Sequence, residues 1–204
     1  MQNPAASPDR PHDAPASAHS PHVCPWWLGY LLASPLRRIF YQPAKVLAAH
    51  VRAGMTVLEP GPGMGFFTLE LARLVGSAGR VIAVDLQSRM LDGLRRRAAK
   101  AGVLDRLDAR LATPDSMGLA DLAGAVDFTL AFAVVHELPA AAQFFGEVAR
   151  ASKPCARLLF VEPMGHVTAP HFDAELQAAR NAGFTLVASP SLRRSHSALL
   201  EREG

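Results

Sequence analysis

The stretch VLEPGPGMGFFT at residues 57–68 places three glycines, Gly61, Gly63 and Gly65, directly after a short apolar run. A strand that continues into a glycine-rich turn and then a helix brings its backbone close to a nucleotide-like ligand. Glycine suits such a turn because it permits positive φ and carries no Cβ that would block the ligand. The chemistry to expect at this turn is therefore the binding of a nucleoside-type molecule.

The residues around the turn argue against a phosphate-bearing ligand. In the dinucleotide fingerprint G-x-G-x-x-G, Phe66 would occupy the place of the third glycine, which disfavours a nicotinamide-dependent oxidoreductase. The lysine of a P-loop is also missing, which disfavours the binding of a triphosphate. Glu59 would repel a phosphate and attract an ammonium or sulfonium group. Asp85, at the end of the next apolar run VIAVDLQ, stands where an acidic residue accepts hydrogen bonds from ribose hydroxyls. These residues favour a ribonucleoside with a cationic, amino-acid-like arm, a description that S-adenosylmethionine meets.

Short apolar runs alternate with helical patterns along the rest of the chain. The runs are continuous rather than alternating, which is typical of strands buried on both faces, and the alternation predicts a doubly wound α/β sheet of seven strands. The last two runs follow one another without a helix between them, so we expect antiparallel pairing at that end. The expected strands are Thr56–Glu59, Val81–Asp85, Leu107–Leu111, Ala125–Phe132, Arg157–Glu162, Thr185–Ala188 and His196–Leu200. The expected helices are Phe66–Val75, Ser88–Ala101, Ala140–Ala151 and Pro170–Ala182, with a shorter one around Pro43.

Four segments occur in a recognisable order: VLEPGPGMG, VIAVDLQSRML, VDFTLAFAVVHEL and ASKPCARLLFVEP. Together they resemble motif I, the second motif, the fourth-strand motif and the segment into strand five of the class I S-adenosylmethionine-dependent methyltransferases. The resemblance covers roughly residues 40–200. It implies a Rossmann-like fold with the last strand antiparallel, S-adenosylmethionine as cofactor, and methyl transfer as the activity.

The resemblance also implies roles for residues at the cofactor. Glu59 would lie near the methionine ammonium and Asp85 would hold the ribose. The segment LATPDSMGL departs from the Asp that the family often has after strand three, so Thr113 and Asp115 are the candidates for the adenine. Cys155 stands where the family usually has glycine and is interpreted as structural. The predicted cofactor-binding set is Glu59, Gly61, Pro62, Gly63, Gly65, Asp85, Leu86, Thr113, Asp115 and Phe132.

Residues for the methyl acceptor should follow strands four and five. His136 is a candidate base because an ordinary imidazole pKa suits proton transfer at neutral pH, although it could instead cap or pack against the next helix. His166, after a glycine, is a second catalytic candidate. Glu162 and Met164 are candidates for substrate binding, and Glu162 could equally hold the loop after strand five through backbone hydrogen bonds.

An N-terminal segment completes the expected architecture. Residues 1–20 are rich in Pro, Ala and Ser and are expected to be a disordered tail. Residues 21–52 are expected to be a helical segment in which Trp26, Trp27 and Tyr30 either pack on the core or form a lid over the substrate. Residues 53–204 would be the S-adenosylmethionine-binding domain.

Composition narrows the class of function. The chain has 204 residues, half of them apolar, and a net charge of +3 with no basic stripe, so no nucleic-acid partner is expected. No signal peptide, membrane span or zinc spacing is present in the sequence, and two distant cysteines fit a reducing compartment, so we expect a cytoplasmic protein without a metal. The expected function is methyl transfer to a small molecule. The alternative is a non-catalytic S-adenosylmethionine-binding or scaffold protein, and the oligomeric state is left open.

Overall fold

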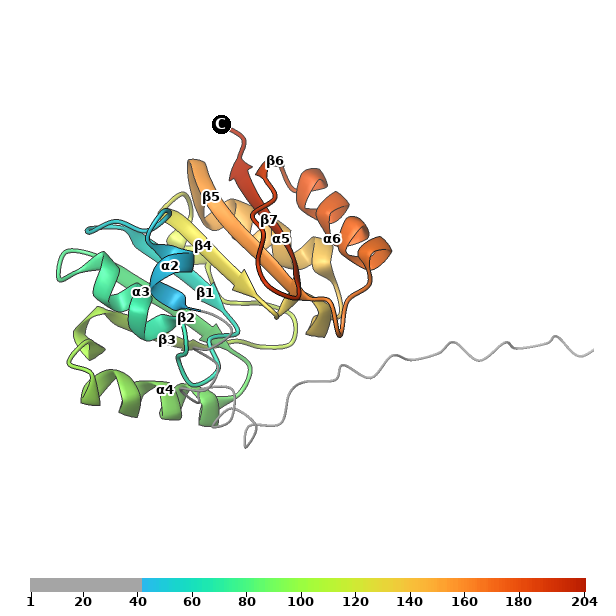
Figure 1. The fold of residues 1–204 in the computed structure, drawn as a ribbon. Helices are drawn as coiled ribbons and strands as arrows, with labels where there is room; N and C mark the ends of the chain where they lie inside the picture. The colour runs from blue at the N-terminus through green and yellow to red at the C-terminus, as the bar shows by residue number, and fades with distance from the viewer. Residues whose placement is uncertain (1–41) are drawn as a thin grey trace, which may run out of the picture.

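A seven-stranded sheet flanked by helices forms the part of the chain that the computed structural model describes, residues 42–204 (Figure 1). The strands are β1 (Thr56–Pro60), β2 (Arg80–Asp85), β3 (Leu107–Leu111), β4 (Val126–Phe132), β5 (Ser152–Pro163), β6 (Phe184–Ala188) and β7 (Ser195–Arg202). The helices are α2 (Pro43–Leu47), α3 (Thr68–Val75), α4 (Ser88–Lys100), α5 (Ala141–Ala151) and α6 (Ala169–Asn181), with 3-10 turns η2 (Leu104–Arg106), η3 (Ala120–Leu122) and η4 (Val135–Glu137).

The strand order is β3-β2-β1-β4-β5-β7-β6. Strands β1 to β5 are mutually parallel, and β7 runs antiparallel between β5 and β6. This confirms the predicted doubly wound sheet with its last strand reversed. The order changes direction between β1 and β4, which is the switch point outside which open α/β sheets bind their ligands.

Two apolar layers hold helices on opposite faces of the sheet. Helices α2 and α3 pack over one face with Val57, Phe128 and Val161. Helices α5 and α6 pack over the other face with Leu58 and Phe160. Because successive residues of a strand point to opposite faces, the short apolar runs supply both layers at once, as their continuous pattern predicted. No helix among the described residues is long and apolar enough to cross a membrane.

The element boundaries differ from the prediction by two residues or more at three places, one of which is the end of β7, at Arg202 rather than Leu200. Helix α3 begins at Thr68 rather than Phe66, because the glycine turn continues through residues 64–67. Strand β5 begins at Ser152 rather than Arg157, with a bulge that lets Val126 pair with Ser152 while Phe128 pairs with Arg157. Residues 1–41, which include the expected tail, Trp26, Trp27 and Tyr30, lie outside the described residues.

The bulge in β5 contains a backbone conformation that suits glycine. Cys155 has φ of 61°, in the left-handed region, and its side chain is exposed. For a residue with a Cβ this region costs about 1–2 kcal/mol. The sequence position where related chains were expected to have glycine is therefore one where this chain carries strain.

Replacing Cys155 by glycine should stabilise the protein. Relief of the strain is partly offset by the larger backbone entropy of glycine in the unfolded chain, which leaves a gain of about 0.5–1 kcal/mol. That corresponds to a rise in the melting temperature of about 1–4 °C, measured by differential scanning calorimetry. Cys155→Ala is the matched control, because it removes the thiol and keeps the Cβ. An equal gain in both variants would show that the thiol, not the backbone, was the source of the destabilisation.

Candidate functional site

The glycine turn joins β1 to α3 at the carboxyl edge of the sheet. The N–H of Gly61 donates to the carbonyl of Val84 over 2.9 Å, which ties the turn to β2. Gly65 has φ of 86°, which favours glycine, and a Cβ there would lie 2.4 Å from Cδ1 of Leu94 on α4, so Leu94 would have to move. Gly63 also has positive φ, 53°, but a Cβ there would meet no atom of residues 42–204 within 4 Å. The turn thus packs against α4 at Gly65, and space is open at Gly63 among the described residues.

Asp85 lies next to that open space. Its carboxylate accepts a hydrogen bond from the N–H of Gln87 at 2.9 Å, and the backbone N–H groups of Gly63 and Leu86 also favour its ionised form. Burial outweighs these contacts and, with a smaller contribution from Glu137, raises the pKa of Asp85 to about 6. Hydrogen bonds from the hydroxyl groups of a ligand would therefore replace part of the hydration that the Asp85 carboxylate loses by burial.

The other residues expected at the cofactor surround the same edge. Glu59 is buried near the end of β1, with 4% of its surface exposed, and Pro62 is buried in the turn. Phe132 ends β4 and packs on Phe67 with ring centroids 4.6 Å apart. Leu86 leaves 38% of its surface exposed. The structure brings all four to the side of the sheet that the glycine turn occupies.

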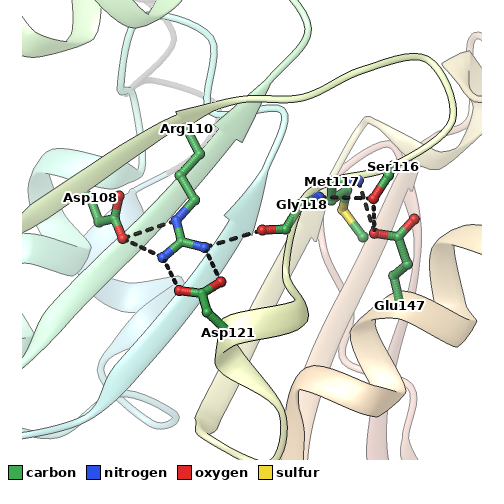
Figure 2. Close-up of polar contacts among 7 residues, drawn as sticks. All are labelled: Asp108, Arg110, Ser116, Met117, Gly118, Asp121 and Glu147. Atoms are coloured by element: carbon green, nitrogen blue, oxygen red, sulfur yellow. Dashed lines mark hydrogen bonds and ion pairs between the residues drawn. The ribbon is translucent and has the colours of Figure 1, made fainter.

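The loop after β3, residues 112–119, carries Thr113 and Asp115, and both are exposed. Thr113 bridges to Ser116, whose carbonyl accepts its N–H at 3.0 Å. Glu147 on α5 accepts the N–H of Met117 at 2.9 Å and the hydroxyl of Ser116 at 3.2 Å (Figure 2). The side-chain amide of Gln143, also on α5, donates to the carbonyl of Asp115.

An arginine secures the other end of this loop. Arg110 on β3 contacts Asp121 at 2.6 Å and Asp108 at 2.7 Å, and it donates to the carbonyl of Gly118 at 3.2 Å (Figure 2). The hydrogen bonds to Asp121 and Asp108 raise the pKa of Arg110 above its usual range. Because α5 and β3 hold it from two sides, the loop that presents Thr113 and Asp115 is fixed before any ligand arrives.

The end of β4 presents His136 through a strained turn. Ala133, directly after β4, has φ of 57°, and its N–H donates to the carbonyl of Val161 at 2.7 Å. The 3-10 turn η4 then carries His136. Strain of this kind is often found at functional sites, where the surrounding structure has to enforce it.

Glu162, near the end of β5, enforces the geometry of η4. Its side chain is completely buried. One carboxylate oxygen accepts the N–H of Val135 at 2.8 Å and that of His136 at 3.4 Å, and the other contacts Nδ1 of His136. Glu162 thus holds a loop through backbone hydrogen bonds, as one interpretation of the sequence expected, but the loop is the one after β4. Its burial leaves it without the exposed surface that direct contact with a substrate needs.

The second histidine lies beside the first. The ring of His166 is exposed and stands perpendicular to that of His136, with centroids 5.5 Å apart. Met164, in the same loop after β5, is 55% exposed. Burial lowers the pKa of His136, but the hydrogen bond and charge of Glu162 more than offset it, so the pKa of His136 is raised. No cluster of three or more His, Cys, Asp or Glu residues that could hold a metal occurs within residues 42–204.

Sequence reasoning missed three features of this edge. The hydrogen bonds of Arg110 and Glu147 to the loop after β3 left no signal in the sequence, because nothing in it distinguishes either residue from an ordinary charged residue of the surface. The strain at Ala133 is also invisible in the sequence. Glu175 on α6 did leave a signal, because it interrupts an apolar face with period three to four at Phe172, Leu176 and Ala179.

Comparison with known proteins identifies the fold. Residues 57–155 match a family model described as a methyltransferase domain. The chain is 32% identical over 113 residues to the ubiquinone/menaquinone biosynthesis C-methyltransferase UbiE of Marinomonas sp. (strain MWYL1), a match of 55% of this chain and 44% of that protein. It is 40% identical over 62 residues to a mitochondrial ribosomal RNA small subunit methyltransferase of Arabidopsis thaliana, a match of 30% of this chain and 16% of that protein. The chain thus spans less than half of the length of either relative.

A solved structure extends the likeness to most of the chain. The S-adenosylmethionine-dependent methyltransferase from Aquifex aeolicus superposes with a TM-score of 0.78 at 24% identity, over 88% of this chain and 98% of that one. Residues 57–155 therefore match a methyltransferase domain, and the chain has the Rossmann-like fold of S-adenosylmethionine-dependent methyltransferases, which implies S-adenosylmethionine as its cofactor.

Proposed function

We propose that this protein transfers the methyl group of S-adenosylmethionine to a small-molecule acceptor that gives up a proton in the reaction. The observation that carries the proposal is that a histidine held by a buried carboxylate, His136 with Glu162, lies at the same sheet edge as the glycine turn and Asp85. Parallel strands end on one side of a sheet, so β1, β2, β4 and β5 direct a cofactor site and a base toward a common space.

The residues at the edge fit the cofactor. The open space at Gly63 lies beside Asp85. A side chain at position 63 would keep a ribose from approaching the backbone there. Asp85 would accept from the ribose hydroxyls, Glu59 would lie near the ammonium, and Gly61, Pro62, Gly65 and Phe132 would line the site. Leu86 offers an apolar surface to the adenine, and the loop with Thr113 and Asp115 would bond its edge. The bound cofactor supplies an electrophilic methyl group on a sulfonium.

His136 is proposed as the general base. Nδ1 contacts Glu162, and within the described residues no hydrogen bond occupies Nε2, which leaves that nitrogen to accept the proton of the acceptor. The cofactor would supply the methyl group to the acceptor atom, and Nε2 of His136 would hold the proton that the acceptor gives up. Glu162 stabilises the imidazolium that forms, as a carboxylate does behind the histidine of a catalytic triad. His166 and Met164 would contact the acceptor, together with Trp26, Trp27 and Tyr30 from the segment outside the described residues.

A small acceptor suits the surface near His136. The exposed groups of the loop after β5, next to His136, include the apolar Met164 and the imidazole of His166. The names of the relatives include both a quinone-pathway enzyme and an RNA methyltransferase, so RNA is the competing acceptor class. The absence of a basic stripe favours the small molecule. The reducing cytoplasm is the proposed location, in keeping with the free thiol of Cys155.

Replacing Asp85 by asparagine should weaken the binding of S-adenosylhomocysteine by about 10–100-fold, since charge-assisted hydrogen bonds to ribose would be lost. In the wild type, the affinity should be constant above neutral pH and should fall as the pH drops through about 6, because protonated Asp85 is a poorer acceptor. The affinity of the Asp85→Asn variant should lack this dependence. Isothermal titration calorimetry between pH 5 and 8 measures both. The same pH dependence in the variant would remove Asp85 from the ribose site.

Replacing His136 by asparagine should lower kcat by about 10²–10⁴-fold, the usual contribution of a general base, while affinity for S-adenosylhomocysteine stays unchanged. Formation of S-adenosylhomocysteine across a panel of phenols, quinols, amines, thiols and short RNAs measures turnover and separates the acceptor classes. Wild-type protein that binds the cofactor and turns over no member of the panel would support the scaffold alternative. Full activity in His136→Asn would show that His136 is not the general base.

Replacing Glu147 by alanine should weaken S-adenosylhomocysteine binding by about 3–10-fold, the value of one or two hydrogen bonds that hold the loop after β3. S-inosylhomocysteine, which lacks the adenine amino group, should lose less affinity. Glu70→Ala, which breaks the exposed pair with Arg73 on α3, is the control. Equal losses for both ligands would mean that the loop does not contact the adenine edge.

A further inference from the structure

A second buried carboxyl group lies on the α6 side of the proposed base. Glu175 is 3% exposed and occupies the apolar face of α6 with Phe172 and Leu176. Nε2 of His171, one turn earlier, lies 3.3 Å from one carboxyl oxygen, but neither oxygen has a hydrogen-bond partner in the described part of the chain. A buried carboxyl group without hydrogen bonds is costly, so its position calls for an explanation.

The register of β5 places Glu175 in the same layer as Glu162. Phe160 stacks on Phe172 of α6 with ring centroids 4.9 Å apart, so this face of β5 is the one that α6 covers. Glu162 follows Phe160 by two residues and therefore points to the same face. Glu175 lies three residues after Phe172 on the buried side of α6. Both carboxyl groups thus occupy the layer between β5 and α6.

Their electrostatic interactions agree with this placement. Burial, with a smaller contribution from the charge of Glu162, raises the pKa of Glu175 to about 7, although the charge of His136 partly offsets the rise. Glu175 in turn favours the charged form of His136. Glu175 therefore changes its charge near neutral pH, and that charge acts on His136.

We propose that Glu175 is a positioning residue for His136, a second buried carboxyl group that stabilises the imidazolium form of the base from the α6 side. The groups that face His136 are Glu162 from β5, Glu137 from η4, Glu175 from α6 and His166 from the loop after β5. Glu162 fixes the ring by direct contact, whereas Glu175 acts through its charge. As His136 takes the proton of the acceptor, Glu175 in its ionised form compensates the new positive charge in a place that water does not reach. The inference rests on the proposed role of His136 as base.

Nuclear magnetic resonance titration of the His136 imidazole tests this directly and needs no acceptor. The ring nitrogens of wild type, Glu175→Gln and Asp173→Asn are followed in long-range ¹H–¹⁵N spectra, with His136→Asn for assignment. Asp173 is exposed on the same helix and controls for a general change of charge. We expect the pH at the midpoint of the His136 titration to fall in Glu175→Gln and to stay unchanged in Asp173→Asn. A midpoint that stays at the wild-type value in Glu175→Gln would overturn the proposal.

A second variant guards against a folding artefact. Glu175→Leu removes the buried carboxyl group and should raise the melting temperature more at pH 8 than at pH 5, because a carboxyl group whose pKa is raised on folding destabilises the protein as the pH rises above the unfolded value. An equal rise at both pH values would contradict a buried ionising Glu175. Calorimetric binding of S-adenosylhomocysteine is measured on every variant. Retained binding with an unshifted His136 midpoint rejects only the role of Glu175, whereas no binding in the wild type rejects the proposed function itself.

Discussion

The carboxylate of Glu162 has no water to solvate it, so its hydrogen bonds must come from the protein, and the end of β4 supplies them. Two backbone N–H groups of η4 and Nδ1 of His136 converge on it. Those bonds fix a turn that begins with Ala133 in a left-handed conformation. Without that carboxylate the strained turn would have little to hold it, and the imidazole would lose both its orientation and its charge partner. The position of the proposed base therefore depends on a residue of the neighbouring strand, 26 positions further along the chain.

The sheet order explains how one edge combines a cofactor site with a base. Strand β1 has β2 on one side and β4 on the other, so the glycine turn lies between Asp85 and η4. Helix α4 closes the turn at Gly65 through Leu94, and space stays open at Gly63. The loop after β3 completes the edge, held by Arg110 from β3 and Glu147 from α5. Each contact is made by a different element, which leaves the site little freedom to rearrange before a ligand binds.

The sequence predicted what depends on local pattern. Continuous apolar runs gave the strands, the glycine spacing with Glu59 and Asp85 indicated an adenosyl cofactor, and the order of the motifs indicated the family. What the sequence could not provide depends on contacts between distant segments: the partnership of Glu162 with His136, the anchoring of the loop after β3, and the bulge that lengthens β5. Glu162 shows the difference, because its position after an apolar strand suggested either a substrate contact or a structural role. Its complete burial favours the structural one.

A crystal structure of the complex with S-adenosylhomocysteine tests the central claim most directly. The account predicts the ribose hydroxyls on Asp85, the adenine beside Leu86 and the loop after β3, and the sulfur facing Nε2 of His136 across a space large enough for an acceptor. A ligand bound in that way but with Nε2 of His136 turned away from the sulfur would contradict the role of the base. A ligand bound elsewhere, or with Asp85 uninvolved, would contradict the assignment of the edge as the cofactor site.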